Sequence, residues 1–296
     1  MLTQKIRAGA GSDVLFKYDH SKSTWETVGI YLVGIGCNPY PNGISYEPRR
    51  NRLHVTWTNR HFIDYDGAND PNSTIHKAQA GPNGPENNQD LCYAASDNLG
   101  KSWFKPSSSS SVSAGLDGNN TIDDDTPNTG IISIDPQFIA VNIPKHSGIM
   151  NQEAQCVDTQ GGVHVLNRDN RSGTEFWKHY YLRPGGTSWD TMVIPDCIPT
   201  ATGPRGTIAY GPASDSVYFA LPSNEPGKKH LTILQKRRSP EGTWQDIETL
   251  WQDEGYDGEP LVDEEALLEH GLLSVFTTWS GDKDRNRRVV VLDFNF

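Results

Sequence analysis

The sequence is poor in methionine, in basic residues and in long apolar runs. It has three Met among 296 residues, and 26 Lys and Arg stand against 37 Asp and Glu, which gives a formal charge of −11. Nucleic acids and anionic membranes are bound by clustered Lys and Arg, so this balance argues against both partners. The longest apolar runs, 30–36 and 289–294, fall well short of the roughly 18 residues of a membrane-spanning helix. We expect a soluble protein that binds neither nucleic acid nor membrane.

Cysteine is also scarce, and the N-terminus has no basic-then-apolar signal for secretion. The four cysteines are widely separated and form no C-x-x-C motif, which argues against zinc and thioredoxin-type redox sites. We expect buried thiols at Cys37, Cys92, Cys156 and Cys197.

Helical patterns are nearly lacking, whereas turn residues are frequent, with 28 Gly and 19 Pro. Short segments alternate with period two and are rich in β-branched and aromatic residues, which predicts half-buried strands. They cover 53–57, 163–166, 216–220 and 273–277. One short helix is plausible at 263–270, where a turn between strands fits as well. The expected fold class is all-β.

Four hairpins share a layout in which Thr-Trp or Ser-Trp opens the returning strand. Their tryptophans are Trp25, Trp103, Trp189 and Trp244, and we expect each ring to wedge between adjacent sheets. The second hairpin, 96–103, approximates the sialidase-type Asp box S-x-D-x-G-x-[ST]-W, with Asn98 at the third position. This motif argues for a fold rather than for a chemistry.

Four-stranded units of about 40 to 50 residues, repeated radially, form a β-propeller. The units lie at about 13–29, 44–105, 153–195, 206–251 and 259–296. We expect one β-propeller domain over 1–296, with long loop insertions at about 64–90 and 105–148. About five blade units are visible, and we expect an incomplete seven-bladed propeller; a closed five-bladed ring is the alternative.

Several short stretches, taken in their order along the sequence, resemble a known family. They are 6–12, 38–43, 53–60, 87–93 and 150–153. With these the chain resembles the BNR-repeat family of seven-bladed β-propellers, which includes ulvan lyases and fungal rhamnose–glucuronate lyases. The resemblance implies a secreted, monomeric protein that takes an acidic polysaccharide or oligosaccharide and cleaves it by β-elimination without a cofactor.

The resemblance also assigns residues. It implies that Arg7 and Arg60 line the pocket and bind the uronate carboxylate, and it places Gln89 where relatives often have a histidine. The family's catalytic Tyr and His residues lie mostly upstream of the position of Arg7, so we expect impaired or absent catalysis in this chain.

The residues themselves point to related positions. A uronate lyase needs Arg, Asn or Gln at the carboxylate and Tyr or His as acid and base. Asn59, Arg60 and His61 end one strand, and Arg205 starts another among glycines. We expect Asn59, Arg60, Arg205 and Gln89 to bind substrate, and His61 to act in catalysis. The alternatives are that Arg60 pairs with Asp64 and that Arg205 only supports a turn.

Three further histidines and two glutamates complete the candidates. His54 and His164 occupy equivalent positions in two repeats, which favours packing, whereas His179 is a second catalytic candidate. Glu153 and Glu259 could bind calcium or act as a hydrolase pair, but a solvated or arginine-paired role is the simpler expectation. We predict no metal site beyond that possible calcium.

Three functions remain open at this level. The first is a lyase of rhamnose–glucuronate linkages, the second a carbohydrate-binding protein without activity, and the third a glycoside hydrolase of the rhamnosidase or sialidase kind. A shared fold does not choose among them.

Overall fold

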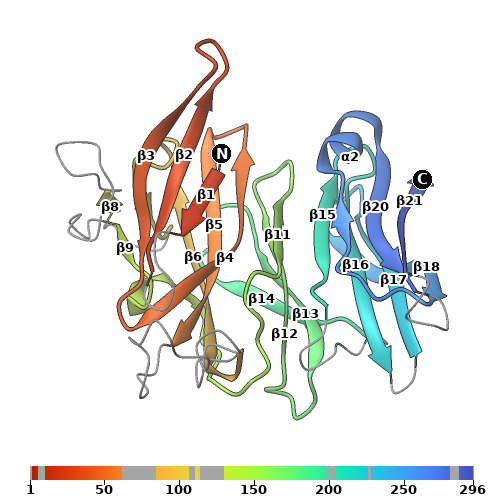
Figure 1. The fold of residues 1–296 in the computed structure, drawn as a ribbon. Coiled ribbons are helices and arrows are strands. Elements are labelled where there is room, and N and C mark those ends of the chain that lie inside the picture. The colour runs from red at the N-terminus through yellow and green to blue at the C-terminus, as the bar shows by residue number, and fades with distance from the viewer. Residues whose placement is uncertain are drawn as a thin grey trace. The chain divides into compact units, whose positions relative to one another are not determined.

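The computed structural model describes residues 2–5, 11–61, 85–106, 111–113, 130–195, 197, 199, 204–225, 228–280 and 287–295 (Figure 1). The chain divides into two compact units. The first unit comprises 1–152 with 185–187, and the second comprises 153–184 with 188–296. Among the described residues, no helix has the length and apolarity needed to cross a membrane.

The first unit begins with a four-stranded sheet in the order β1-β2-β3-β9. Its strands are β1 (Leu2–Lys5), β2 (Asp13–Asp19), β3 (Thr24–Val33) and β9 (Ile131–Ile132). The pairs within β1-β2-β3 are antiparallel, whereas β9 pairs with β3 in parallel. The predicted hairpin at 13–29 therefore forms, within a larger sheet.

The second sheet of this unit runs β4-β5-β6-β7-β8, and β10 pairs with β6 beside that path. The strands are β4 (Cys37–Glu47), β5 (Arg52–His61), β6 (Asn88–Ser96), β7 (Ser102–Phe104), β8 (Ser111–Ser113) and β10 (Ile139–Val141). Two short 3-10 helices, η1 (Pro85–Asn87) and η2 (Pro136–Phe138), precede β6 and β10.

The hairpin between β6 and β7 has the Asp-box geometry that its sequence predicts. Asn98 takes the acidic position, where its Oδ1 accepts from Ser96 Oγ at 2.9 Å and from the Ser102 backbone N–H at 2.8 Å. Trp103 is fully buried, as expected. Trp25 at the equivalent place is 55% exposed, so the wedge prediction is wrong for that hairpin.

The loop insertions are only partly described. Residues 62–84, 107–110 and 114–129 lie outside the described ranges. The C-terminal part of the second insertion, 130–148, belongs to the described residues. Ile131, Phe138 and Ile143 are buried there, and the first two belong to the main apolar cluster of the unit.

The second unit contains two four-stranded antiparallel sheets, in the orders β11-β12-β13-β14 and β15-β16-β17-β18. The first has β11 (Ala154–Val157), β12 (Val163–Asp169), β13 (Phe176–Leu182) and β14 (Trp189–Val193). The second has β15 (Thr207–Gly211), β16 (Ser216–Glu225), β17 (Lys228–Arg238) and β18 (Trp244–Glu254). One apolar cluster joins the two sheets, with Trp177, Ile208 and Phe219 among its members.

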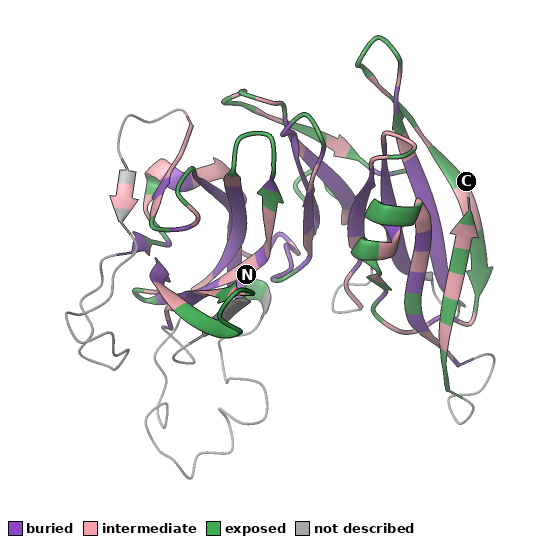
Figure 2. Ribbon diagram, turned by 90° about the horizontal axis from the view of Figure 1, so that it is seen from above, coloured by how far each residue is buried: buried purple, intermediate pink, exposed green. Residues whose placement is uncertain are grey.

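A three-stranded sheet ends the unit, with β19 (Leu261–Val262), β20 (Leu272–Trp279) and β21 (Arg288–Asn295). The predicted helix forms as α2 (Glu264–His270), because Asp263 caps its N-terminus and Gly271, at φ 68°, supplies the left-handed turn that ends it. Burial is strongest on the central strands, whereas β21 is largely exposed or half-buried (Figure 2).

All four predicted strand segments lie inside observed strands: β5, β12, β16 and β20. All four cysteines are buried thiols. The chain is therefore an all-β protein with several four-stranded sheets.

Candidate functional site

The strongest of the predicted site residues is Arg60, the penultimate residue of β5. The strand register sets Arg60 opposite Asn38 of β4 and Asn88 of β6. Its Nε donates to Asn88 Oδ1 and its Nη2 donates to Asn151 Oδ1, both at 2.9 Å. The guanidinium carbon lies 5.0 Å from the centre of the Tyr40 ring. Arg60 is half-buried, so its planar group is fixed while part of it stays exposed.

The two asparagines that hold Arg60 are themselves buried and fixed. Asn88 and Asn151 are 1% and 4% exposed. Asn88 Nδ2 donates to the Ile149 carbonyl at 2.9 Å, and Asn151 Nδ2 donates to Gln152 Oε1 at 3.3 Å. Because each amide nitrogen is engaged, each amide oxygen is turned toward the guanidinium.

The backbone next to these residues adopts unusual conformations. Asp90, His146 and Gln152 have positive φ angles of 56°, 61° and 57°. Non-glycine residues seldom adopt this left-handed region, and such strain concentrates at functional sites. Asp90 is held by a backbone pair with Ile143, and its carboxylate also accepts from the Ile143 N–H at 3.0 Å. These two bonds to Ile143 hold the backbone of β6 at Asp90, two residues after Asn88.

Asn59 and His61 do not join Arg60, because successive residues of a strand project to opposite faces. Asn59 is 1% exposed, and its Nδ2 donates to the Ser133 carbonyl at 2.8 Å. Its amide thus lies in the core of the sheet rather than beside Arg60. Gln89 is half-buried and pairs with Asn59 in the register.

His61 ends β5 and is half-buried. Burial and the nearby charge of Lys145 lower the pKa of its imidazole. Its ring is therefore neutral at neutral pH and able to accept a proton.

His179, the second catalytic candidate, lies in the second unit on β13. The ring is 2% exposed, and its Nε2 lies 2.9 Å from Nδ1 of His164, with the two rings stacked. His164 Nε2 in turn lies 3.2 Å from Asp158 Oδ2. His179 also lines a pocket of about 320 Å³ in this unit. A buried acid–histidine–histidine chain thus ends at a pocket.

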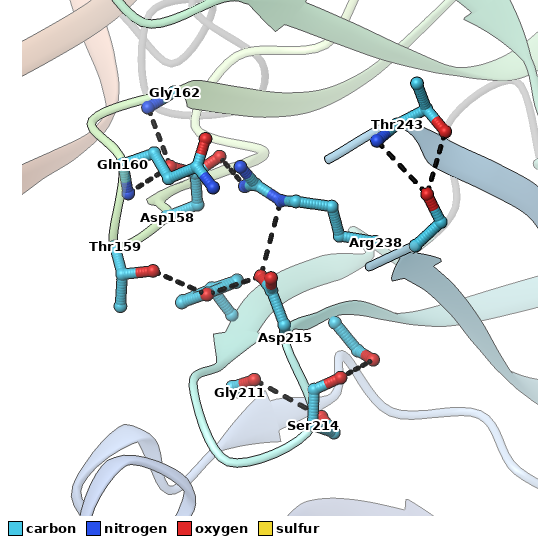
Figure 3. A network of polar contacts seen from close by, with 12 residues as sticks. Asp158, Thr159, Gln160, Gly162, Gly211, Ser214, Asp215, Arg238 and Thr243 are labelled. Carbon is cyan, nitrogen blue, oxygen red and sulfur yellow. Dashed lines mark hydrogen bonds and ion pairs between the residues drawn. The ribbon is translucent and has the colours of Figure 1, made fainter. Parts of the chain in front are cut away.

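Asp158, the acid of this chain, is itself held by Gln160, Gly162 and Arg238 (Figure 3). The backbone N–H groups of Gln160 and Gly162 each donate to Asp158 Oδ1 at 2.8 Å, and Arg238 donates to Oδ2. Burial opposes ionisation of Asp158, but the bonds from His164, Gly162 and Arg238 outweigh it and lower the pKa of the carboxyl. Arg238 also pairs with Asp215 at 3.3 Å.

The expected equivalence of His54 and His164 extends to their contacts. Nδ1 of His54 lies 2.8 Å from the hydroxyl of Tyr93, and its Nε2 lies 3.3 Å from Glu47 Oε2. In both sheets an acid bonds a histidine, which bonds a ring on the next strand.

Arg205 and the two glutamates form ion pairs within the second unit. Arg205 Nη1 lies 2.9 Å from Glu259 Oε1. Glu153 pairs with the buried Arg168 at 2.7 Å, and that guanidinium stacks 4.2 Å from the centre of Trp177. The expectation of a solvated or arginine-paired role for the two glutamates is confirmed in its paired form. Within the described residues, no group of three or more His, Cys, Asp and Glu side chains could hold a metal ion.

The remaining candidate, Arg7, lies outside the described residues, and so does Asp64, the proposed partner of Arg60. Sequence reasoning missed Tyr40, Asn88 and Asn151 as neighbours of Arg60. The signal was present, because the stretches 38–43, 87–93 and 150–153 that carry the family resemblance each supply one of these three residues.

Comparison with solved structures indicates the fold. A point mutant of NanB sialidase from Streptococcus pneumoniae matches with a TM-score of 0.53 at 12% identity, over 96% of this chain and 36% of that protein. The leech intramolecular trans-sialidase complexed with 2,7-anhydro-Neu5Ac matches with a TM-score of 0.51 at 12% identity, over 97% and 36%. The chain thus spans about a third of the length of these proteins. This likeness shows a sialidase-like fold.

Comparison with protein families identifies the relationship. A search of curated proteins found no match. Residues 3–196 match the family described as BNR repeat-containing family member, which is more than half of the chain. The protein therefore belongs to the BNR repeat-containing family.

Proposed function

We propose that this is a carbohydrate-active protein that binds a carboxylate-bearing sugar through Arg60. The observation that carries the proposal is the convergence of Asn88, Asn151 and Tyr40 on one half-buried guanidinium. A planar guanidinium recognises a carboxylate through two parallel hydrogen bonds, and it does so best when its orientation is fixed beforehand.

Two further observations support this proposal. The family is one of BNR repeats, and the similar solved structures are a sialidase and a trans-sialidase, the latter with 2,7-anhydro-Neu5Ac bound. Two of the positive-φ residues, Asp90 and Gln152, also lie within two residues of Asn88 and Asn151, the side chains that hold Arg60. We propose in addition that the sheets are blades of a β-propeller and that the protein meets its polysaccharide outside the cell.

Binding without turnover is the form of this function that the geometry favours. β-Elimination would need a base on the same side of the sugar as the group that neutralises its carboxylate. His61 has the required neutral ring, but it projects from the opposite face of β5 to Arg60. The lyase of rhamnose–glucuronate linkages, implied by the family resemblance, is the second candidate, and a sialidase-like hydrolase is the third.

Calorimetric titration with a rhamnose–glucuronate oligosaccharide tests the binding proposal. We expect saturable binding that weakens about tenfold or more in Arg60→Ala, because a charge-assisted pair is lost. Arg60→Lys should retain only part of the affinity, since an ammonium cannot form the bidentate pair. Arg49→Ala, which removes an exposed arginine near the other end of β5, is the matched control and should bind as the wild type does.

The same samples separate the three functions. Absorbance of an unsaturated sugar would show a lyase, and new reducing ends without a double bond would show a hydrolase. Binding that depends on Arg60 with neither product is the expected result. Equal affinity for the carboxyl-reduced, neutral oligosaccharide would refute recognition of the acid group.

A further inference from the structure

The pocket of the second unit is a candidate for a separate ligand. Its volume of about 320 Å³ lies at the lower end of the roughly 300–1,000 Å³ of small-molecule sites, so it suits a ligand of one or two sugar rings. The lining comes from β13, β14 and the β17–β18 hairpin, and includes His179, Tyr181, Met192, Lys236 and Trp244. These strands carry none of the residues that hold Arg60.

The chain from Asp158 determines which nitrogen of His179 can receive a proton. Asp158 is ionised and only accepts, so Nε2 of His164 carries a hydrogen. Burial lowers the pKa of both imidazoles, so His164 is neutral and its Nδ1 accepts from Nε2 of His179. The second nitrogen of His179, Nδ1, then has a lone pair.

This nitrogen is an acceptor on a residue that lines the pocket. Among the described residues, no hydrogen bond involves Nδ1 of His179. This atom is also not fully enclosed by protein. A bound hydroxyl group would supply the donor that it lacks.

Lys236 gives the pocket a positive charge, and the side chain that accepts its hydrogen bond carries no negative charge. Its ammonium donates to the Met192 sulfur at 3.0 Å, and a thioether is a weak acceptor. Burial lowers the pKa of this amine, and the charge of the exposed Asp246 offsets only part of that effect, so the protein does not fully compensate the charge of Lys236. Arg183 and Asp190, which also line the pocket, pair with each other at 3.0 Å. A ligand anion is therefore the natural partner for Lys236.

Two aromatic side chains form the wall of the pocket. Tyr181 and Trp244 meet edge to face, with ring centres 6.0 Å apart and planes at 85°. Arg238 lies over the Trp244 ring at 4.4 Å and holds it in place. Aromatic rings of this kind combine a large apolar face with a polar edge, which suits a flat face of a sugar ring.

We infer that this pocket binds one carboxylate-bearing sugar unit, with Lys236 on the carboxylate, Tyr181 and Trp244 against the ring, and Nδ1 of His179 accepting from a hydroxyl group. The site shares the acidic-sugar class of the proposed function but uses none of its residues. The protein would then bind acidic sugar at two independent places.

Calorimetry on the full chain with methyl glucuronoside tests this inference by stoichiometry. We expect two equivalents on the wild type, one on Arg60→Ala, one on Lys236→Met and none on the double variant. Lys101→Met, which removes an exposed lysine from the first unit, is the matched control and should keep both. If Lys236→Met leaves the stoichiometry unchanged, or if neutral methyl glucoside fills this pocket equally well, the inference is wrong. Loss only in Arg60→Ala would refute the second site and leave the first intact.

A second measurement covers the possibility that Lys236→Met unfolds. In wild-type protein with 15N-labelled histidine, methyl glucuronoside should shift the Nδ1 resonance of His179, because a lone pair becomes hydrogen-bonded. The resonances of His20, which is exposed in the other unit, should not move. An unchanged His179 signal at saturating ligand would overturn the inference. N-acetylneuraminate in place of the glucuronoside then shows which acidic sugar the pocket prefers.

Discussion

The two sheets β4–β8 and β11–β14 each contain a series of three hydrogen-bonded side chains, and the two series differ in their last residue. In each, an acid bonds Nε2 of a histidine on the second strand, and Nδ1 of that histidine bonds a ring on the third. In the first sheet the last ring is Tyr93, which is 1% exposed and ends the chain inside the core. In the second it is His179, which lines a pocket.

The difference lies in what the last ring can do. With Nε2 of His54 donating to the Glu47 carboxylate, the Tyr93 hydroxyl donates to Nδ1 and satisfies a buried acceptor, which is a structural role. An imidazole in the same place donates through one nitrogen and leaves the other as an acceptor. A repeat can thus supply a packing element in one sheet and a binding element in another through a single residue type.

The two sheets should differ most in the stability lost when the acid of each chain, Asp158 or Glu47, is replaced. Asp158→Asn leaves Arg238 buried with only part of its ion pairing, and we expect a loss of about 3–5 kcal/mol in the free energy of unfolding. Glu47→Gln should lose only about 1–2 kcal/mol, because its partner Arg50 has a side chain 44% exposed and is solvated. Urea unfolding measures both, and equal losses would show that the two chains are anchored alike.

Acid should weaken the second chain over a defined pH range. Burial lowers the pKa of His164 and His179 below 6.5, so in the folded protein they stay neutral where the unfolded chain takes up protons. Stability is therefore complete above pH 6.5 and falls below it, by about 1.4 kcal/mol per pH unit for each ring, until the folded-state pKa is reached. The contribution of Asp158, whose pKa is lowered, is lost only below its ordinary 3.8.

Measuring the free energy of unfolding at a series of pH values between 7.5 and 5 tests this effect. The slope should correspond to an uptake of about two protons when the protein unfolds. His179→Phe should flatten the profile, whereas His20→Gln, which removes an exposed histidine, should leave it unchanged. A profile of His179→Phe as steep as that of the wild type would locate the proton uptake elsewhere.

The smallest expected effect concerns the end of the first chain. Tyr93→Phe removes one hydroxyl and leaves Nδ1 of His54 buried without a donor, which costs about 1–2 kcal/mol. Binding of methyl glucuronoside should not change. Tyr46→Phe, which removes the hydroxyl of an exposed tyrosine bonded to Asn51, is the control and should change stability by less than about 0.5 kcal/mol. Altered sugar binding in Tyr93→Phe would contradict a purely structural role.

Much of the fold followed from local pattern. Period-two alternation located β5, β12, β16 and β20, and the helix α2 formed within 263–270, where a short helix and a turn had fitted equally well. The short strand β9 was missed, because two apolar residues carry no periodicity and its parallel partner β3 lies about a hundred residues away. The burial of Trp25 was predicted wrongly. The hairpin motif determines that a Trp stands at the start of the returning strand, but not whether another part of the chain covers its ring.

The site was predicted less completely for a related reason. Arg60 was identifiable from its place at a strand end, but Asn151 reaches it across 91 residues of sequence. Arg60 and His61 are neighbours along a strand, and the alternation of side chains between the two faces of a strand separates them. The equivalence of His54 and His164 was visible, but the identity of their partners depends on the sheet register.

Arg60 as the ligand of a sugar carboxylate is tested most directly by a crystal structure of the protein with bound methyl glucuronoside. Both carboxylate oxygens should lie about 2.7–3.0 Å from nitrogens of the Arg60 guanidinium, with Asn88 and Asn151 still bonded to it. A sugar bound at full occupancy with its carboxylate elsewhere, and with Arg60 in contact only with protein, would contradict the proposal.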